Sequence, residues 1–294
     1  YLCERHCYVD SGSGTLLNIT PDGGITPPGT VGLGGYGDGN YGKDEYGTPR
    51  TAVDRMSVAT PAYTLSNWGS HLVAMTSADG RLLYWDPQAT GTKLAAVANA
   101  PSSNRSFVVT PERFIILFGA GGTPHKFQWC DQENNTNWTV GVNSKAGSFH
   151  VEPSAPIMAN IVTAGGTLFF TAAGAYIIRY IGLPYVYQYE KVQDCPPPYS
   201  PAALVDTPAG VFWGALNGFW LYNGSVASPM ACPVWDFVSA NIDRNYSRFY
   251  ANCVNIAPKF EVWYFFSAGR AGTDYYVSYN YKTEIWSMGW MNRI

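Results

Sequence analysis

Residues 32–37, Gly-Leu-Gly-Gly-Tyr-Gly, match the G-x-G-x-x-G pattern of dinucleotide-binding proteins. In those proteins a strand precedes the pattern and a helix follows it, because the helix N-terminus binds the pyrophosphate. Here residues 38–42 (DGNYG) follow, and this composition cannot form a helix. The match reflects glycine content alone, and we predict no nucleotide site.

Two further sets of side chains have the donor types of metal sites. The first offers oxygen donors at a spacing similar to calcium loops: Asp38, Asn40, Asp44 and Glu45. The 12-residue frame of a calcium loop is absent, so a solvated loop is the favoured interpretation. The second set is Cys3, His6 and Cys7, which could bind zinc but has no evident fourth ligand. A strand edge is the favoured interpretation there, and we expect no stoichiometric metal and no cofactor.

The residue types of hydrolytic enzymes are present but scattered. The four histidines fall in four different segments, at positions 6, 71, 125 and 150, and the G-x-S-x-G pattern is absent. Glycosidases use two nearby carboxylates, but Asp79, Asp86 and Asp206 each lie next to turn residues. We therefore predict that the chain is not an enzyme. The Trp-Asp dipeptides at 85–86 and 235–236 lack the Gly-His element that accompanies them in WD40 repeats.

Composition limits the classes of partner. Charged residues make up 13% of the 294 residues and aromatic residues 15%, with a formal net charge of −3. A chain with so little charge is expected to contact protein over much of its surface, although a large core would also lower the charged fraction. No basic patch indicates nucleic-acid binding, and no apolar run is long enough for a transmembrane helix. The six cysteines are sparse, which favours reduced thiols, and the start at Tyr1 suggests an incomplete N-terminus.

A pattern of about four short strands recurs along the chain. Apolar runs rich in β-branched and aromatic residues alternate with Gly, Pro and Asp-Gly turns, of which Asp79-Gly80 is the strongest hairpin signal. The clearest unit covers residues 106–139, where Trp138-Thr139 could begin or anchor an outer strand. An aromatic residue ends or lies in the third strand of each unit: Trp85, Trp129, Tyr180, Tyr222 and Tyr279. The period of about 40–50 residues is typical of propeller blades.

The predicted fold is all-β: a single β-propeller domain over residues 1–294, with about six four-stranded antiparallel blades. Residues 1–20 are expected to form a hairpin, and residues 233–242 a short helix. Residues 21–49 form an inserted Gly/Tyr-rich loop with ten glycines. A flat double sandwich is the alternative, but sandwiches rarely repeat one unit at this period.

Several motifs of medium length together resemble a family of tailed-bacteriophage virion proteins. They occur at residues 84–87 (YWDP), 100–105 (APSSNR), 109–113 (VTPER), 129–139 (WCDQENNTNWT), 179–184 (RYIGLP), 218–224 (GFWLYNG) and 279–281 (YNY). The family is the tail nozzle or hub proteins of short-tailed phages, also called packaged-DNA stabilisation proteins. The resemblance covers residue 16 to about residue 286 and leaves the tail type open.

The resemblance implies a structural subunit of the phage tail, located in the virion. It implies a homo-oligomeric ring, a hexamer, below the portal and adaptor, which extends the DNA channel and helps to retain the packaged genome. Double-stranded DNA would pass without sequence-specific binding, and the chain would not insert into a membrane. We expect Tyr36, Tyr41 and Tyr46 of the loop to contact a neighbouring subunit, the alternative being that they fold back on their own blade. A carbohydrate-binding or glycan-hydrolysing propeller is the alternative function.

Overall fold

The computed structural model describes residues 2–3, 6–10, 16–21, 63–76, 79–89, 93–243, 251–269 and 273–293. Nearly all of the Gly/Tyr-rich loop lies outside these residues, including Tyr36, Tyr41 and Tyr46. The dinucleotide-like pattern and the calcium-like set at positions 38, 40, 44 and 45 also lie outside them. The predictions made for these segments stay predictions.

In its described residues the chain forms a five-bladed β-propeller of four-stranded antiparallel sheets. The first two blades are β4 (Tyr63–Trp68), β5 (His71–Thr76), β6 (Leu82–Trp85) and β7 (Ala95–Ala96), then β8 (Ser106–Val109), β9 (Ile115–Phe118), β10 (Lys126–Trp129) and β11 (Gly147–His150). The next two are β12 (Ile157–Thr163), β13 (Gly166–Thr171), β14 (Gly174–Gly182) and β15 (Val186–Gln193), then β16 (Leu204–Thr207), β17 (Gly210–Ala215), β18 (Gly218–Tyr222) and β19 (Ala227–Pro229). The last is β20 (Asn252–Ile256), β21 (Glu261–Phe266), β22 (Thr273–Asn280) and β23 (Ile285–Arg293).

The predicted number of about six complete blades is wrong. The N-terminal hairpin is present as expected, but with β1 (Leu2–Cys3), β2 (His6–Asp10) and β3 (Leu16–Asn18) it forms a sheet of only three strands. This sheet packs on the first blade, where Ile19 lies in a buried cluster with Leu83 and Trp85. The hairpin therefore supplies a partial sheet rather than a sixth blade.

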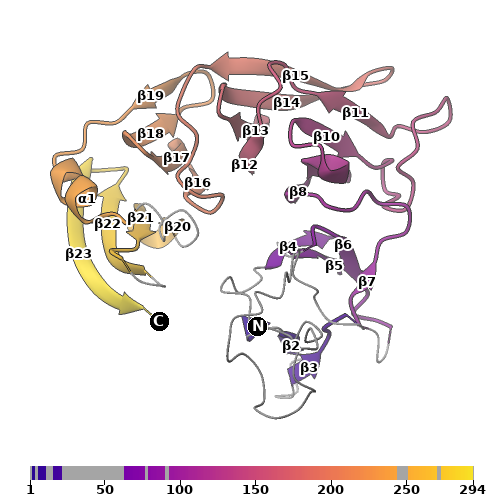
Figure 1. Ribbon diagram of the computed structural model, residues 1–294, viewed down its shortest axis with the longest axis horizontal. Helices are drawn as coiled ribbons and strands as arrows, with labels where there is room; N and C mark the ends of the chain where they lie inside the picture. Colours follow the sequence, from indigo (N-terminus) through magenta and orange to yellow (C-terminus); the bar gives the residue numbers. More distant parts are fainter. Residues whose placement is uncertain are drawn as a thin grey trace, which may run out of the picture.

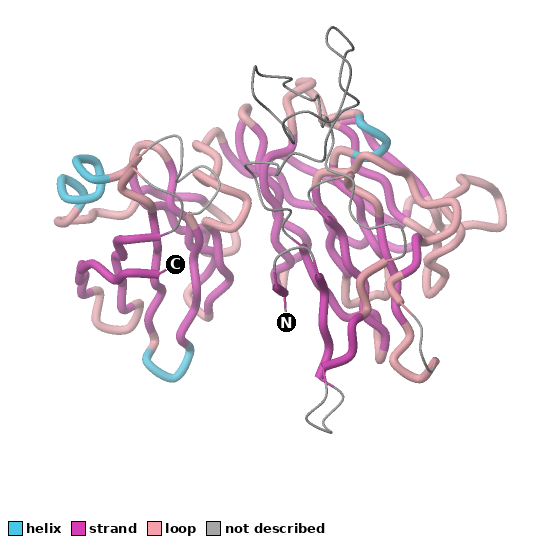
Figure 2. Tube along the Cα trace, turned by 60° about the horizontal axis from the view of Figure 1, so that its bottom comes forward, coloured by secondary structure: helices cyan, strands magenta, loops and turns pink. Residues whose placement is uncertain are grey.

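The blades follow one another along an arc (Figure 1), with consecutive innermost strands β4, β8, β12, β16 and β20 in contact. The last blade and the N-terminal sheet lie on opposite sides of the opening of this arc. The helical segments α1 (Trp235–Asn241), η1 (Ala120–Gly122) and η2 (Ala257–Lys259) lie at the periphery of the sheets (Figure 2). No helix in the described residues has the length and apolar character needed to span a membrane.

Apolar side chains between neighbouring blades hold the arc together. Successive side chains of a strand point to opposite faces of its sheet, so a blade between two others must be apolar on both faces. In β13, Phe169 packs towards the second blade and Phe170 towards the fourth, and both are fully buried. Burial of each such side chain stabilises the fold by roughly 2–3 kcal/mol.

Local sequence signals located most strands correctly. β6, β10 and β18 end at Trp85, Trp129 and Tyr222, as predicted, and the short helix falls within residues 233–242. The outer strand of the second blade does not begin at Trp138 but at Gly147. Trp138 is instead buried in the cluster between the first two blades.

The Asp79-Gly80 turn provides a test of how tightly this fold constrains its backbone. Gly80 has a φ of +64°, and a Cβ atom there would overlap the backbone of Asn104. The backbone N–H and the side-chain Nδ2 atom of Asn104 both donate hydrogen bonds to the Gly80 carbonyl. Gly121 has a φ of +65° but no atom within 4 Å of the corresponding position.

We expect Gly121→Ala to cost about 1–2 kcal/mol, the strain of a left-handed alanine. Gly80→Ala should cost roughly 2 kcal/mol more, because the Asn104 backbone must also move. Urea unfolding of the two variants measures the difference, and equal costs would contradict the close approach of Asn104.

Candidate functional site

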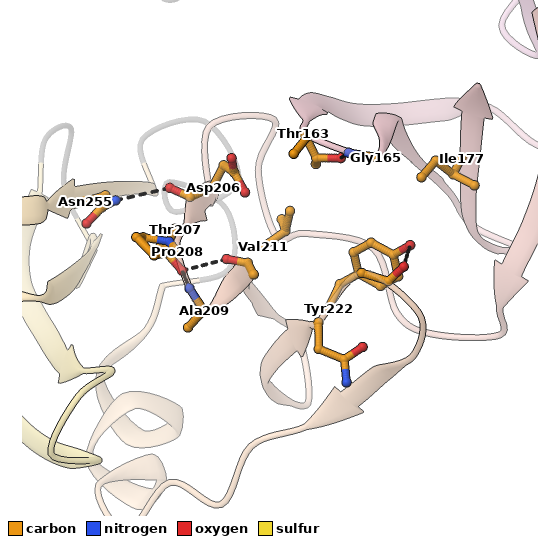
Figure 3. A pocket seen from close by; sticks show the side chains of 14 residues that line it. Thr163, Gly165, Ile177, Asp206, Thr207, Pro208, Ala209, Val211, Tyr222 and Asn255 are labelled. Carbon is orange, nitrogen blue, oxygen red and sulfur yellow. Dashed lines mark hydrogen bonds between the residues drawn. The ribbon is translucent and has the colours of Figure 1, made fainter. Parts of the chain in front are cut away.

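A pocket of about 520 Å³ lies among the turns of the third, fourth and fifth blades (Figure 3). Its lining comes from the β12–β13 and β16–β17 turns, from β14 and β17, and from the ends of β18 and β20. The lining residues are Thr163, Ala164, Gly165, Ile177, Asp206, Thr207, Pro208, Ala209, Gly210, Val211, Tyr222, Asn223, Gly224 and Asn255.

Two turns of the same Thr-x-x-Gly type form the walls of this pocket. The hydroxyl of Thr163 donates to the carbonyl of Gly166 at 2.9 Å, and that of Thr207 donates to the carbonyl of Gly210 at 2.6 Å. Gly210 has a φ of +124°, and a Cβ atom there would overlap the Tyr222 carbonyl oxygen of the neighbouring strand. The glycines were visible in the sequence as turn signals, whereas the threonines that close the turns were missed.

Asp206 is the one carboxylate in the lining. Partial burial raises the pKa of its carboxyl above the ordinary value, and a hydrogen bond from the Thr207 backbone N–H offsets part of that rise, while the residue as a whole remains exposed. The Nδ2 atom of Asn255 donates to the Asp206 backbone carbonyl at 3.2 Å. The Asn255 Oδ1 atom is buried and has no hydrogen-bond partner among the described residues.

Tyr222 contributes the aromatic part of the lining. Its hydroxyl donates to the Gly224 carbonyl at 2.7 Å, and desolvation raises its pKa, although the nearby Arg179 guanidinium opposes that rise. Arg179 in turn forms a 2.9 Å ion pair with Glu190. Arg179 and Glu190 of the third blade and Tyr222 of the fourth thus form a polar network across the boundary between these blades.

The pocket holds one carboxylate and no tryptophan. Hydrolysis of a glycoside needs two carboxyl groups a few ångströms apart, and sugar binding typically uses an exposed aromatic ring as a platform. Asp79 and Asp86, the other acids considered from the sequence, accept hydrogen bonds from the backbone N–H groups of Arg81 and Gln88 within their own turns. In this lining Asp206 is the single carboxylate, and the one aromatic ring, that of Tyr222, is buried.

The structure brings two of the four scattered histidines together. His125 and His150, from the start of β10 and the end of β11, have ring centroids 5.3 Å apart. His71 lies elsewhere, 5.1 Å from the Tyr84 ring. In the zinc-like set, Cys3 and His6 are register partners in the β1–β2 pair. Among the described side chains no three His, Cys, Asp or Glu residues converge on a possible metal position.

A second candidate site is the turn between β14 and β15, which connects two long strands of the third blade. The base of the hairpin is anchored on the second blade, where Tyr187 packs edge-on against Trp129 at 5.3 Å and its hydroxyl lies 3.0 Å from the Thr110 Oγ1 atom. Beyond this anchor Ile181, Leu183 and Tyr185 are 49, 70 and 73% exposed. A rigid base therefore presents an apolar turn to solvent.

Four cysteines of the last four blades are free thiols. Cys130 and Cys195 are buried, and Cys232 and Cys253 are half-buried. Burial raises the pKa of the Cys130 thiol to about 12, although the Ile115 backbone N–H donates to its sulfur at 3.2 Å and lowers it in part. A thiol in this environment stays protonated and is a poor nucleophile at neutral pH.

The similarities between this chain and known proteins are weak. No protein-family model matches the chain, and no curated protein sequence matches it. Among solved structures, the AfRom2 CNH domain superposes with a TM-score of 0.43 at 14% identity, over 74% of this chain and 67% of that one. Dihydro-heme d1 dehydrogenase NirN superposes with a TM-score of 0.47 at 9% identity, over 79% of this chain and 46% of that one. The WD40 domain of SCAP from fission yeast superposes with a TM-score of 0.41 at 12% identity, over 79% of this chain and 56% of that one. The chain spans only about half of the latter two, and scores this low do not indicate its function.

The buried Cys130 predicts a pH dependence of stability. In the unfolded chain the thiol ionises near pH 8.5–9, whereas the folded chain holds the proton up to about pH 12. The contribution of this thiol to stability is therefore complete below about pH 9 and is lost as the pH rises towards 12.

Between pH 9 and 11 we expect the wild-type chain to lose about 2 kcal/mol more of its free energy of unfolding than Cys130→Ala loses. Urea unfolding at several pH values measures both proteins, and titrations of all other groups cancel in the comparison. Parallel pH profiles would show that Cys130 is not held protonated.

Proposed function

We propose that this chain is a structural protein of a bacteriophage tail, a subunit of a ring-shaped nozzle or hub that extends the DNA channel below the portal and adaptor. The observation that carries the proposal is the apolar β14–β15 turn on its rigid base. Leu183 and Tyr185 are about 70% exposed, while Tyr187, two residues beyond, is 2% exposed. Large apolar side chains held out from a rigid element are typical of protein–protein contacts, because little conformational entropy is lost on binding.

The surface chemistry supports an assembly role more than a catalytic one. Only 13% of the residues are charged, and the pocket among the turns of the third, fourth and fifth blades offers a single carboxylate. The family resemblance of the sequence motifs supports the phage tail as the assembly. A closed ring needs two different, complementary surfaces on each copy. The β14–β15 turn is proposed as one of them, and the Gly/Tyr-rich loop with Tyr36, Tyr41 and Tyr46 stays a predicted second one.

The proposal is also consistent with DNA that moves through the ring without being held. A formal net charge of −3 gives no attraction for phosphates, so passage would be governed by the width of the channel. Retention of the genome would then depend on how the assembled ring closes with its neighbours.

Replacement of Leu183 and Tyr185 by serine tests the contact. The double variant Leu183→Ser/Tyr185→Ser should keep the thermal stability of the wild type, because both side chains are exposed, but should weaken ring assembly by roughly 30-fold, the effect of losing a typical interface hot spot. Sedimentation velocity over a concentration series measures the assembly.

The matched control is Leu216→Ser/Val226→Ser, which removes two apolar side chains that are 57 and 52% exposed on the fourth blade. Assembly of the control should equal that of the wild type. If all three proteins assemble equally well, the β14–β15 turn is not part of the ring contact.

A further inference from the structure

The outermost strand of the fifth blade, β23, differs from the other outer strands in being long and free of charge and proline along most of its free edge. Its pairing with β22 is regular from Ile285 to Trp290 and shifts at a bulge between Trp290 and Arg293. Natural sheets limit pairing with other molecules by short edge strands, charged residues or proline. β7, β11 and β19 have two, four and three residues, and β19 ends in Pro229. β15 has eight residues but includes Glu190 and Lys191. β23 has nine residues, Ile285–Arg293, with no proline and no charge before its last residue.

Several large apolar side chains of β23 are exposed to solvent. Ile285, Met288 and Trp290 are 61, 49 and 79% exposed. Met288 and Trp290 lie on one face of the sheet and Ile285 on the other, as the alternation of a strand requires. Within the described residues β22 is the only strand that pairs with β23, which lies on the perimeter of the molecule (Figure 1). A long apolar edge of this kind is a template for a further strand.

We propose that β23 pairs antiparallel with β23 of a second copy of this chain, about a two-fold axis at Met288. Met288 then lies opposite the same residue of the second copy. Trp286 lies opposite Trp290, and Ile285 opposite Met291, twice each by symmetry. The two small residues, Ser287 and Gly289, lie opposite one another. From residue 286 to residue 290 every apolar side chain thus meets another apolar side chain, and the 285–291 pair lies at the bulge that follows Trp290.

The neighbouring symmetric registers are less complementary. Centring the pair on Ser287 places the Glu284 carboxylate opposite Trp290. Centring it on Gly289 places Arg293 opposite Ile285, and Asn292 opposite Trp286. In the register centred on Met288 the charged residues Glu284 and Arg293 lie outside the apolar pairs, and no like charges oppose each other.

This contact does not rest on the proposed function. A two-fold contact joins two copies and cannot close a ring by itself. It uses β23, whereas the proposed ring contact uses the β14–β15 turn of another blade. The pair can therefore form between single chains or between one chain from each of two rings.

Met288→Lys tests the pairing, with Ser228→Lys on β19 as the matched control, since Ser228 is also an exposed residue of an outer strand. In the pair, Met288→Lys places two ammonium groups directly opposite each other, so the dissociation constant of the two-chain species should rise at least about tenfold. Ser228→Lys should leave it unchanged. Sedimentation equilibrium measures both, and near-ultraviolet circular dichroism confirms that each variant is folded.

Disulfide formation tests the register. Residues opposite each other in an antiparallel pair have Cα atoms about 4.5–5.5 Å apart, within the range of a disulfide. Met288→Cys should therefore form a disulfide between two copies on mild oxidation, whereas Ser287→Cys, opposite Gly289, should not. Peptide mass spectrometry identifies the linked residues against the wild-type background of six cysteines.

Loss of the two-chain species in Met288→Lys together with a 288–288 disulfide would support the proposal. A wild-type chain that is monomeric at tens of micromolar, an unchanged dissociation constant in Met288→Lys, or a link through position 287 instead of 288 would each overturn it. A Leu183→Ser/Tyr185→Ser variant that still pairs but forms no ring would separate this contact from the proposed ring contact.

Discussion

Burial of both faces of each blade is the constraint on which the rest of this structure depends. In β9, Ile115 and Leu117 pack towards the first blade and Ile116 and Phe118 towards the third, and all four are fully buried. A sheet of this kind cannot face water on either side without exposing large apolar area. Successive blades must therefore stack, and the stacking brings their turns together around the pocket that contains Asp206.

The same constraint has consequences at the ends of the arc. The first blade is covered on its outer side by the three-stranded N-terminal sheet, through Ile19 and Leu94. The fifth blade packs on the fourth through Phe219 and Tyr264, but within the described residues no further sheet pairs with its outermost strand. Apolar groups that the fold leaves uncovered are available for contacts with other chains, which links the packing of the blades to a role in assembly.

Strand positions could be predicted because their signals are local. Trp85, Trp129 and Tyr222 end strands where the sequence changes from aromatic to turn residues. The start of the outer strand of the second blade could not be predicted, because its position depends on a distant contact. Gly147 begins that strand where any side chain would overlap the Trp129 ring, 18 residues earlier, while Trp138 fills the space between two blades. The exposure of Leu183 and the burial of Tyr187 likewise follow from how one blade lies on another, which a single sequence does not encode locally.

The proposed function makes this propeller a repeated structural subunit around a channel. Electron microscopy of the purified chain, with averaging of single-particle images, tests it most directly. The account predicts closed rings of six copies with an open axial channel, one propeller to each subunit. Single propellers at every concentration tested, or paired propellers that never close into a ring, would contradict it.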